Sequence, residues 1–443
     1  MTLDDSKPGG PAFMLRALRH RNYRLFFSGQ SISLIGTWMT RIATSWLVYR
    51  LSGSALLLGV VGFAGQIPSF VLAPFAGVLV DRWNRHRLLV TTQVLALLQS
   101  FAMAILALSG RIKIWHVIAL SVFQGLINAF DMPARQAFVV EMVERREDLA
   151  NAIALNSSMV NAARLLGPSI GGLVIAAVGE GWCFMIDAIS YLAVIASLLM
   201  MSLTTRASLT TRGANMLRQL REGWTYAANF APIRNVLLLL ALVSLVGMPY
   251  TVLMPIFASK ILHGGPNVLG LLMAASGVGA LIGAMFLAAR KTVLGLGKFI
   301  PIMAGTFGAG LVAVSFTRVV WLAAILMVVT GLGFMVQMAV SNTVLQTIVD
   351  EDKRGRVMSF YTMAFMGTAP FGSLLAGSVA ERIGVPYTLM FGGIGCVVGA
   401  LWFARSLPSL RKDVRPIYVK IGILPEVATG MQQSTELSVP PST

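Results

Sequence analysis

Residues 77–87 read Gly-Val-Leu-Val-Asp-Arg-Trp-Asn-Arg-His-Arg, a short basic turn between two long apolar runs at 55–80 and 88–109. An apolar helix of about 20 residues is long enough to cross the hydrocarbon core of a bilayer. Both flanking runs reach that length, so the turn is expected to join two antiparallel membrane-spanning helices. The same alternation of long apolar runs and short polar turns continues along the chain.

The composition of the chain agrees with a membrane protein. Of its 443 residues, 56% are hydrophobic and 12% are charged, and the mean hydropathy is +0.76. Soluble domains carry about 25% charged residues. The net charge of +17 would favour nucleic acid as a partner in a soluble protein. Here the basic residues lie between apolar runs, so we exclude nucleic acid and expect the lipid bilayer as the surroundings.

Twelve candidate spans follow from the apolar runs. They are expected at 25–49, 55–80, 88–109, 115–139, 152–177, 182–203, 235–260, 268–289, 298–316, 320–347, 357–380 and 386–406. The predicted fold class is an all-α integral membrane protein, with twelve transmembrane helices in two pseudo-symmetric six-helix bundles.

The distribution of basic residues predicts the orientation. An even number of spans brings both termini to one side, and roughly 26 of the Lys and Arg residues lie on that side, against roughly 6 on the other. Because Lys and Arg are enriched in cytoplasmic loops, we expect both termini in the cytoplasm. We expect the protein in the inner membrane of a bacterium, as a multi-pass protein.

The chain is predicted to divide into five segments. They are a cytoplasmic N-terminal segment at 1–24, bundles at 25–203 and 235–407, a cytoplasmic connector at 204–234, and a disordered cytoplasmic tail at 408–443. In the connector, Met216, Leu217, Leu220 and Trp224 recur at helical spacing, which predicts an amphipathic helix on the membrane surface. The apolar character is lost in the tail.

The two halves carry similar features about 200 residues apart. Mixed-charge loops occur at 141–148 and 349–356, and in each half a small residue then precedes a proline, at Gly167-Pro168 and Ala369-Pro370. Two related six-helix halves bind a substrate at their interface near the middle of the bilayer. We therefore expect a central cavity between the bundles.

The turn at 77–87 resembles the signature loop of the major facilitator superfamily, which is written GxxxDRxGRR. The matching residues are Gly77, Asp81, Arg82, Arg85 and Arg87. Asn84 stands where the family has its second Gly, and Asn also tolerates a left-handed turn. The resemblance implies two six-helix bundles that transport by alternating access, with this loop as a conformational latch. The alternative is a basic loop that only fixes topology.

The fifth span contains Gly167-Pro168-Ser-Ile-Gly171-Gly172. Glycines at this spacing allow close helix packing, and the proline removes a backbone donor. The stretch resembles the antiporter motif GxxxGPxxGG of superfamily exporters, with Ala163 at its first position. This resemblance implies export by antiport. The alternative is helix packing without bearing on direction.

The fourth span departs from the family pattern. Drug exporters of the superfamily carry an RxxQG stretch there, with an Arg linked to proton coupling. In this chain the stretch at 121–125 reads Ser-Val-Phe-Gln-Gly, so Ser121 stands in place of the Arg. Asp131 and Arg135 follow on one helical face, where each neutralises the other. They form either a relocated charge switch or a structural pair. Protons as the coupling ion therefore rest on the resemblance alone.

Other polar residues within the spans are candidates for the cavity or for coupling, because polar groups in a bilayer face partners or water. They are Arg41, Gln66, Asn128, Asn161, Arg164, Asp187, Gln337 and Asn342. Arg41 and Asp187 both lie in the outer third of their spans. We expect them to form an ion pair or to line the cavity wall.

Motifs of enzymes and of ATP-driven pumps are absent from the sequence. It contains no HExxH or GxxxxGK[ST] stretch, and its four His residues and two Cys residues are widely separated. We therefore expect no enzymatic activity, no cofactor and no metal site. Transport would then be driven by a gradient.

The predicted function is a secondary active transporter that exports an amphipathic small molecule, such as a drug, a siderophore or another metabolite. The stretches Asp131-Met-Pro-Ala-Arg135-Gln and Arg164-Leu-Leu-Gly-Pro168 resemble the exporter branch that includes enterobactin and macrolide efflux proteins. We expect the chain to act as a monomer. Two alternatives remain, which are an importer or lysophospholipid flippase, and a non-transporting membrane sensor or assembly factor on the same scaffold.

Overall fold

The computed structural model describes residues 15–143, 145–201, 224–290 and 292–420. In these ranges the chain is helical, and no strand occurs. Within the described part of the chain, eleven helical stretches are long and apolar enough to cross a membrane. The first long helix, α2, completes a set of twelve, although Arg41 and Arg50 interrupt its apolar sequence.

The first six long helices form one group. They are α2 (Arg21–Ser52), α3 (Ala55–Arg82), α4 (Arg85–Leu108), α5 (Ile114–Met142), α6 (Leu149–Val178) and α7 (Glu180–Leu199). Short 3-10 helices precede α2 and α6, namely η1 (Arg16–Arg19) and η2 (Arg146–Asp148). Within the group, α2 packs against α6 and α7, α3 against α5, and α4 against α5 and α7.

The last six helices form a second group, in which two helices are interrupted by turns of π-helix. They are α9 (Ala231–Leu242) with η3 (Val243–Gly247), α10 (Tyr250–Ile256) and η4 (Phe257–Ile261); α11 (Pro266–Ala288); α12 (Leu296–Phe316); α13 (Val320–Ile348); α14 (Glu351–Thr362) with η5 (Met363–Gly367) and α15 (Ala369–Ile383); and α16 (Val385–Lys420). Here α12 packs against α13 and α16, and α11 packs against α13.

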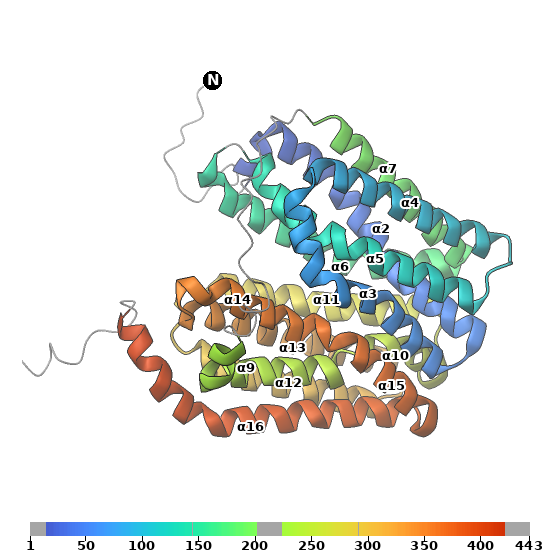
Figure 1. Cartoon of the computed structure of the whole chain (residues 1–443). Coiled ribbons are helices and arrows are strands. Elements are labelled where there is room, and N and C mark those ends of the chain that lie inside the picture. The colour runs from blue at the N-terminus through green and yellow to red at the C-terminus, as the bar shows by residue number, and fades with distance from the viewer. Residues whose placement is uncertain (1–14, 144, 202–223, 291, 421–443) are drawn as a thin grey trace, which may run out of the picture.

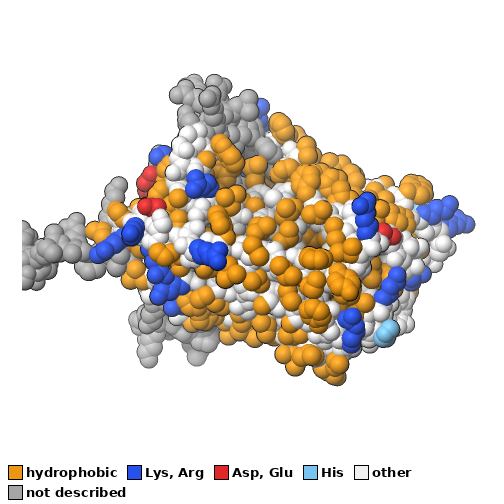
Figure 2. Space-filling view, turned by 90° about the horizontal axis from the view of Figure 1, so that it is seen from below, with side chains coloured by type: hydrophobic (Ala, Val, Ile, Leu, Met, Phe, Trp, Pro, Cys, Tyr) orange, Lys and Arg blue, Asp and Glu red, His pale blue; other side chains and the backbone are white. Residues whose placement is uncertain are grey.

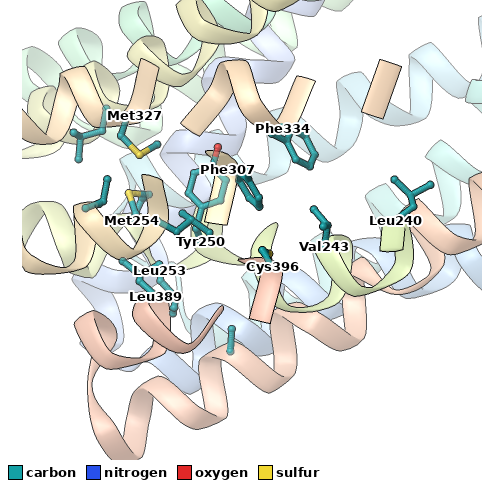
Figure 3. Close-up of a cluster of buried hydrophobic side chains, with 14 of the residues drawn as sticks. Leu240, Val243, Tyr250, Leu253, Met254, Phe307, Met327, Phe334, Leu389 and Cys396 are labelled. Carbon is teal, nitrogen blue, oxygen red and sulfur yellow. The ribbon is translucent and has the colours of Figure 1, made fainter. Parts of the chain in front are cut away.

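The core of the second group is aromatic and sulfur-rich (Figure 3). The ring of Phe307 lies 6.1 Å from that of Tyr250 and 5.3 Å from that of Phe334. Met254 and Met327 are fully buried beside them. Tilted and edge-on ring pairs at these separations stabilise a core beyond the area that they bury. This cluster fixes α10, α12 and α13 relative to one another.

Matching turns support the relation between the halves. The turn after α6 contains Gly179 with φ 91°, and the turn after α15 contains Gly384 with φ 86°. Residues with a side chain rarely adopt this backbone conformation, so glycine is favoured at both positions. The two turns join corresponding helix pairs of the two groups.

The outer surface of the molecule suits a bilayer. Viewed from the side of α16, hydrophobic side chains form a broad central band, and Lys and Arg side chains gather toward the two ends (Figure 2). Both termini of the described chain lie at the same end of the molecule, which we call the terminal face (Figure 1). The opposite end is called the distal face. A band of apolar side chains between charged ends matches the hydrocarbon core between two headgroup layers.

The two groups meet along two helix crossings, α3 with α15 and α6 with α11. A Cβ added to Gly59 would lie 2.6 Å from the carbonyl oxygen of Ser373, and one added to Gly377 would lie 2.6 Å from that of Ala55. The second crossing repeats this contact, because a Cβ on Gly172 would lie 2.9 Å from Cα of Gly270. These glycines lie near the distal ends of their helices. The backbones of the two groups therefore touch near the distal face.

Hydrogen bonds reinforce this distal contact. The Glu381 carboxylate, at the end of α15, accepts hydrogen bonds from the backbone N–H groups of Ala55 and Leu56, at 2.7 and 3.1 Å. It also accepts one from the Ser54 hydroxyl at 3.0 Å. A carboxylate at a helix N-terminus satisfies free N–H groups and matches the positive end of the helix dipole. Glu381 thus caps a helix of the other group.

The helices follow the twelve expected ranges closely, with a difference at the end of the chain. We expected a disordered tail from residue 408, but α16 continues through Pro408 to Lys420 and changes direction near its end (Figure 1). Its last turns pack Val414, Ile417 and Tyr418 against the core, which explains why the helix continues. Residues 421–443 lie outside the described ranges, as does most of the expected amphipathic connector helix. Residues 224–229 are helical.

The glycine crossing yields a test of how the distal face closes. The variant Gly59→Ala must separate α3 from α15, and overpacking of this kind costs about 1–3 kcal/mol. We expect a cysteine at Ala376, which is 9% exposed, to react about tenfold faster with a maleimide in the purified protein. The two native cysteines are buried and give a low background.

Gly65→Ala provides the matched control on the same helix. A Cβ there would meet Ser121 at 3.8 Å, which is ordinary contact. Equal labelling rates in the two alanine variants would show that the Gly59 crossing does not hold the distal face closed.

Candidate functional site

The turn between α3 and α4 is fastened to its own bundle. The Asn84 side chain accepts a hydrogen bond from the Arg87 N–H at 3.0 Å and caps α4. Asn84 has φ −68°, so the left-handed conformation considered from the sequence is not adopted. Arg85 forms an ion pair with Glu141 of α5 at 2.7 Å, and Arg82 and Arg87 are exposed.

Two further contacts tie this turn to neighbouring helices. A ring nitrogen of His86 lies 2.8 Å from the Leu198 carbonyl oxygen of α7, and Trp83 stacks on Phe130 of α5 at 6.1 Å. The surroundings of Gly77 and the side chain of Asp81 lie outside the described part of the structure. The latch role of this loop therefore stays a prediction, while its attachment to α5 and α7 is established.

The predicted pair between Asp131 and Arg135 forms on α5. Asp131 is 5% exposed, and one of its carboxylate oxygens also accepts hydrogen bonds from Thr92 at 2.9 Å and Gln93 at 2.7 Å of α4. A buried carboxylate requires compensation of this kind. The arrangement joins α4 to α5. Both interpretations of the pair, charge switch and structural link, remain predictions.

The motif on α6 uses two faces of its helix. Gly167 and Gly171 face α2, where an added Cβ would lie 2.4 Å from Trp38 Cβ and 3.0 Å from Met39 Cγ. Gly172 faces α11 of the other group, as described above, and the Pro168 carbonyl oxygen points to the same helix. The motif thus brings α6 into close contact with both bundles at once. Sequence reasoning predicted the close packing but not its division between two partners.

Two arginines flank a single tryptophan where α2 meets α6. The guanidinium carbon of Arg41 lies 4.6 Å from the ring centre of Trp38, and that of Arg164 lies 5.3 Å from it. We call Trp38, Arg41 and Arg164 the arginine–tryptophan cluster. A cation over an indole ring is stabilised by the quadrupole of the ring. Among the described residues, neither arginine forms an ion pair with a carboxylate.

The cluster faces the second bundle. Trp38, Arg41 and Tyr49 follow one another at helical spacing on α2, and the Tyr49 hydroxyl donates to Ser259 of the second group at 2.9 Å. On α6, the Arg164 carbonyl oxygen lies 3.3 Å from where a Cβ of Gly277 in α11 would be. Arg41 is exposed although it lies far from either end of its helix. The two cations therefore line the space between the bundles.

Asp187 lies away from this cluster, and the expected ion pair with Arg41 does not form. Asp187 is 2% exposed on α7 and accepts a hydrogen bond from Ser100 of α4 at 2.6 Å. One carboxylate oxygen approaches Gly36 of α2, where an added Cβ would lie 2.6 Å from it. The residue is enclosed by three helices of the first bundle. Among the described residues, the Ser100 hydroxyl is the hydrogen-bond donor to one carboxylate oxygen, and the other oxygen, Oδ1, is buried without a partner.

The amide candidates bond mainly within their own helices. Gln66 donates to Gly62 and Asn161 to Ser157, Asn128 accepts from Gln124 and Asn342 from Gln346, and Gln337 donates to Ser341 at 3.5 Å. Gln337 is fully buried inside the second bundle, whereas the other four amides are partly or fully exposed. Such side chains are free to exchange an intrahelical hydrogen bond for one to a ligand.

Trp38, Glu381 and the Tyr49–Ser259 contact were missed from the sequence. The spacing of Trp38 three residues before Arg41 is a signal for the cation–ring contact. The contacts of Glu381 and Ser259 join residues that are more than 200 positions from their partners, so no local pattern could have revealed them. In the described part of the chain, no three His, Cys, Asp or Glu side chains gather as metal ligands would.

Comparison with known proteins identifies relatives over most of the chain. A family model described as transmembrane secretion effector, within the major facilitator superfamily, matches residues 13–420. This match includes both helix groups, the turn after α3 and nearly all of α16.

Three curated relatives are transporters by name. The staphyloferrin A transporter of Staphylococcus aureus is 26% identical over 88% of this chain and 98% of its own length. The multidrug efflux pump Tap of Mycolicibacterium fortuitum is 29% identical over 87% and 92%, respectively. The macrolide efflux protein A of Streptococcus pyogenes is 24% identical over 85% and 94%.

Solved structures share the fold. A bacterial homologue of the human lysosomal transporter Spinster, in an inward-facing and occupied conformation, superposes with a TM-score of 0.71 at 13% identity, over 89% of this chain and 98% of that one. The nucleoside transporter NupG superposes with a TM-score of 0.68 at 12% identity, over 87% and 99%. These likenesses establish the twelve-helix architecture with two bundles.

The Asp131–Arg135 pair yields a test that separates its two interpretations. Asp131→Asn leaves the half-buried Arg135 without its carboxylate, and we expect a loss of about 1–3 kcal/mol of stability, measured by thermal unfolding in detergent. The double variant Asp131→Asn/Arg135→Gln should recover part of this loss. A structural pair predicts that transport recovers with stability, whereas a charge switch predicts that transport stays lost.

The ion pair of Arg85 and Glu141, in which the carboxylate is exposed, serves as the comparison. Glu141→Gln should cost less than about 1 kcal/mol, because solvent screens exposed pairs. An equal loss in the Asp131 and Glu141 variants would contradict the compensation that we assign to the buried carboxylate.

Proposed function

Because the chain belongs to the transmembrane secretion effectors of the major facilitator superfamily, and is therefore a secondary transporter, we propose that it exports an amphipathic molecule with an anionic group. The observation that carries this proposal is the arginine–tryptophan cluster between the bundles. It combines two cations with an aromatic face, which suits a ligand with one charged and one apolar part.

The charge of the substrate follows from the cost of the two arginines. A cation within the bilayer costs a few kcal/mol or more unless it is compensated, and such residues mark substrate pathways. Among the described residues, Arg41 and Arg164 share the Trp38 ring and neither pairs with a carboxylate, while Asp131 and Asp187 accept hydrogen bonds from other side chains. An anionic group between the guanidinium groups would supply the missing compensation.

The transport cycle proposed for this chain alternates between two closures. Contact of the bundles through Gly59, Gly377 and Glu381 closes the distal face, and access to the cluster is then from the terminal face. Release on the distal side requires these contacts to separate while the terminal face closes. The turn at 77–87 is the proposed latch for the terminal closure.

The terminal face is the proposed cytoplasmic side, in the inner membrane of a bacterium, because Lys and Arg are enriched in cytoplasmic loops. The bundles at 25–203 and 235–407 are the proposed moving bodies, joined by the connector at 204–234. Relatives that are named efflux pumps, together with the motif on α6, support export. Protons are the proposed coupling ion, and a monomer is the proposed functional unit.

Two other functions remain to be distinguished by experiment. An importer or a lysophospholipid flippase would use the same bundles in another direction or on another substrate. A membrane sensor or assembly factor would use the scaffold without transport. The arginine–tryptophan cluster supports a bound ligand, and movement of that ligand across the membrane separates a transporter from a sensor.

Everted membrane vesicles from a host that expresses the protein test the function. With an imposed proton gradient, we expect uptake of the anionic amphiphile 8-anilinonaphthalene-1-sulfonate above that of vesicles without the protein. Uptake by right-side-out vesicles only would indicate an importer. Absence of uptake for this probe and for the cationic dye rhodamine 6G would favour the sensor.

Substitutions in the cluster test the residues proposed for binding. Arg41→Gln and Arg164→Gln should each reduce uptake of the anionic probe about tenfold or more, because a hydrogen bond to a charged group contributes about 1.5–3 kcal/mol. Arg41→Lys should retain part of the uptake, since it keeps the charge.

Arg111→Gln is the matched control, because this arginine is exposed on the turn between α4 and α5. Its uptake should equal that of the unmodified protein. If Arg41→Gln and Arg164→Gln reduced uptake of rhodamine 6G as strongly as that of the anion, the two arginines would not select for negative charge.

A further inference from the structure

A cavity of about 350 Å³ lies at the terminal face of the second bundle, away from the space between the bundles. Its walls come from the starts of α9 and α12, the end of α13 and the last turns of α16. Most of its lining is apolar, including Val236, Val344, Ile348, Phe403 and Leu407. A cavity of this size lies in the range, about 300–1,000 Å³, of pockets that hold small ligands.

The rim of this cavity carries three cations. Lys298 lies in the first turn of α12, and Arg411 and Arg415 lie one turn apart on α16. All three side chains are exposed, and none forms an ion pair with a described residue. No Asp or Glu belongs to the lining. The cavity therefore presents an apolar interior beneath a purely cationic rim.

The position of the cavity matches a bilayer leaflet. The apolar lining comes from α9, α12, α13 and α16, and the three cations belong to the start of α12 and the end of α16, which lie at the terminal face (Figure 1). Lys and Arg at this level attract anionic headgroups, and basic pockets between transmembrane helices bind phospholipid phosphates. The stems of long basic side chains also reach readily to a headgroup.

We propose that this cavity binds one anionic phospholipid of the leaflet at the terminal face. Its phosphate contacts Lys298, Arg411 and Arg415, and part of an acyl chain lies along the apolar walls. In a bilayer the acyl chain is already surrounded by other apolar chains, so the phosphate supplies the selectivity. The lipid thereby fastens the end of α16 to α9 and α12.

Charge complementarity favours a lipid over the other occupants. Free phosphate would use the three cations but leave the apolar walls empty. The C-terminal segment 421–443 is the other candidate occupant, but its acidic side chains are Glu426 and Glu436, which are ten residues apart, so it matches a rim of three cations less well. A phospholipid satisfies both parts of the site, and the surrounding bilayer supplies it at high local concentration.

Native mass spectrometry of the full-length protein in detergent tests the site. Titration with phosphatidylglycerol should give one tight adduct, and phosphatidylcholine with the same acyl chains should bind at least tenfold more weakly. Arg411→Gln/Arg415→Gln should weaken the phosphatidylglycerol adduct about tenfold. Arg405→Gln/Lys412→Gln removes the same charge from α16 outside the lining, and should leave the adduct unchanged.

A second variant keeps all the cations and fills the cavity. A Cβ added at Gly297, which lines the cavity, would have Leu407 Cδ1 as its nearest neighbour at 3.9 Å, so a side chain can enter there without backbone conflict. Gly297→Phe should therefore weaken the phosphatidylglycerol adduct at least fivefold. Its melting temperature without lipid reports whether the fold is retained.

Three results would overturn the proposal. The first is equal binding of the two phospholipids, or equal binding by the two double variants. The second is a site for phosphate alone, in which millimolar inorganic phosphate displaces the adduct and a folded Gly297→Phe protein binds normally. The third is binding of phosphatidylglycerol only after truncation at Lys420, which would make residues 421–443 the native occupant.

Discussion

The close approach of backbones at the glycine crossings is the constraint on which the rest of the structure depends. Inside a bilayer, apolar side chains gain little from leaving lipid for protein, so helices associate through close packing and polar contacts. At Gly59, Gly377, Gly172 and Gly270 the absence of a Cβ lets the two bundles touch. This contact near one face leaves the arginine–tryptophan cluster between the bundles and brings Glu381 to the start of α3.

Charges in the first bundle divide into two kinds by how they are compensated. Asp131 and Asp187 are buried among helices that supply hydroxyl, amide or guanidinium partners. Arg41 and Arg164 instead face the second bundle and share one aromatic ring. The acids thus hold α4, α5 and α7 together, while the cations are left for a ligand. A bundle that moves as one body needs internal charges that stay paired throughout the motion.

Local patterns predicted the features that depend on residues close in sequence. Apolar runs predicted the twelve helices, and the spacing of Asp131 and Arg135 predicted their ion pair. The motif on α6 predicted close helix packing. The interaction of Glu381 with α3, the partner of Asp187 and the extension of α16 to Lys420 depend on helices that are distant in sequence, so they required the structure. Arg41 and Asp187 occupy similar depths, but depth alone does not specify which way a side chain faces on its helix.

The two-sided packing of α6 has a consequence for how such a protein can diversify. Gly167 and Gly172 admit no Cβ without moving a neighbouring backbone, whereas Arg41 is exposed and Trp38 and Arg164 are half-buried. Changes in substrate preference are therefore expected to accumulate at the cavity wall over evolutionary time, while the helix seams stay fixed. A single rigid framework can in this way support a lineage of exporters with different cargoes.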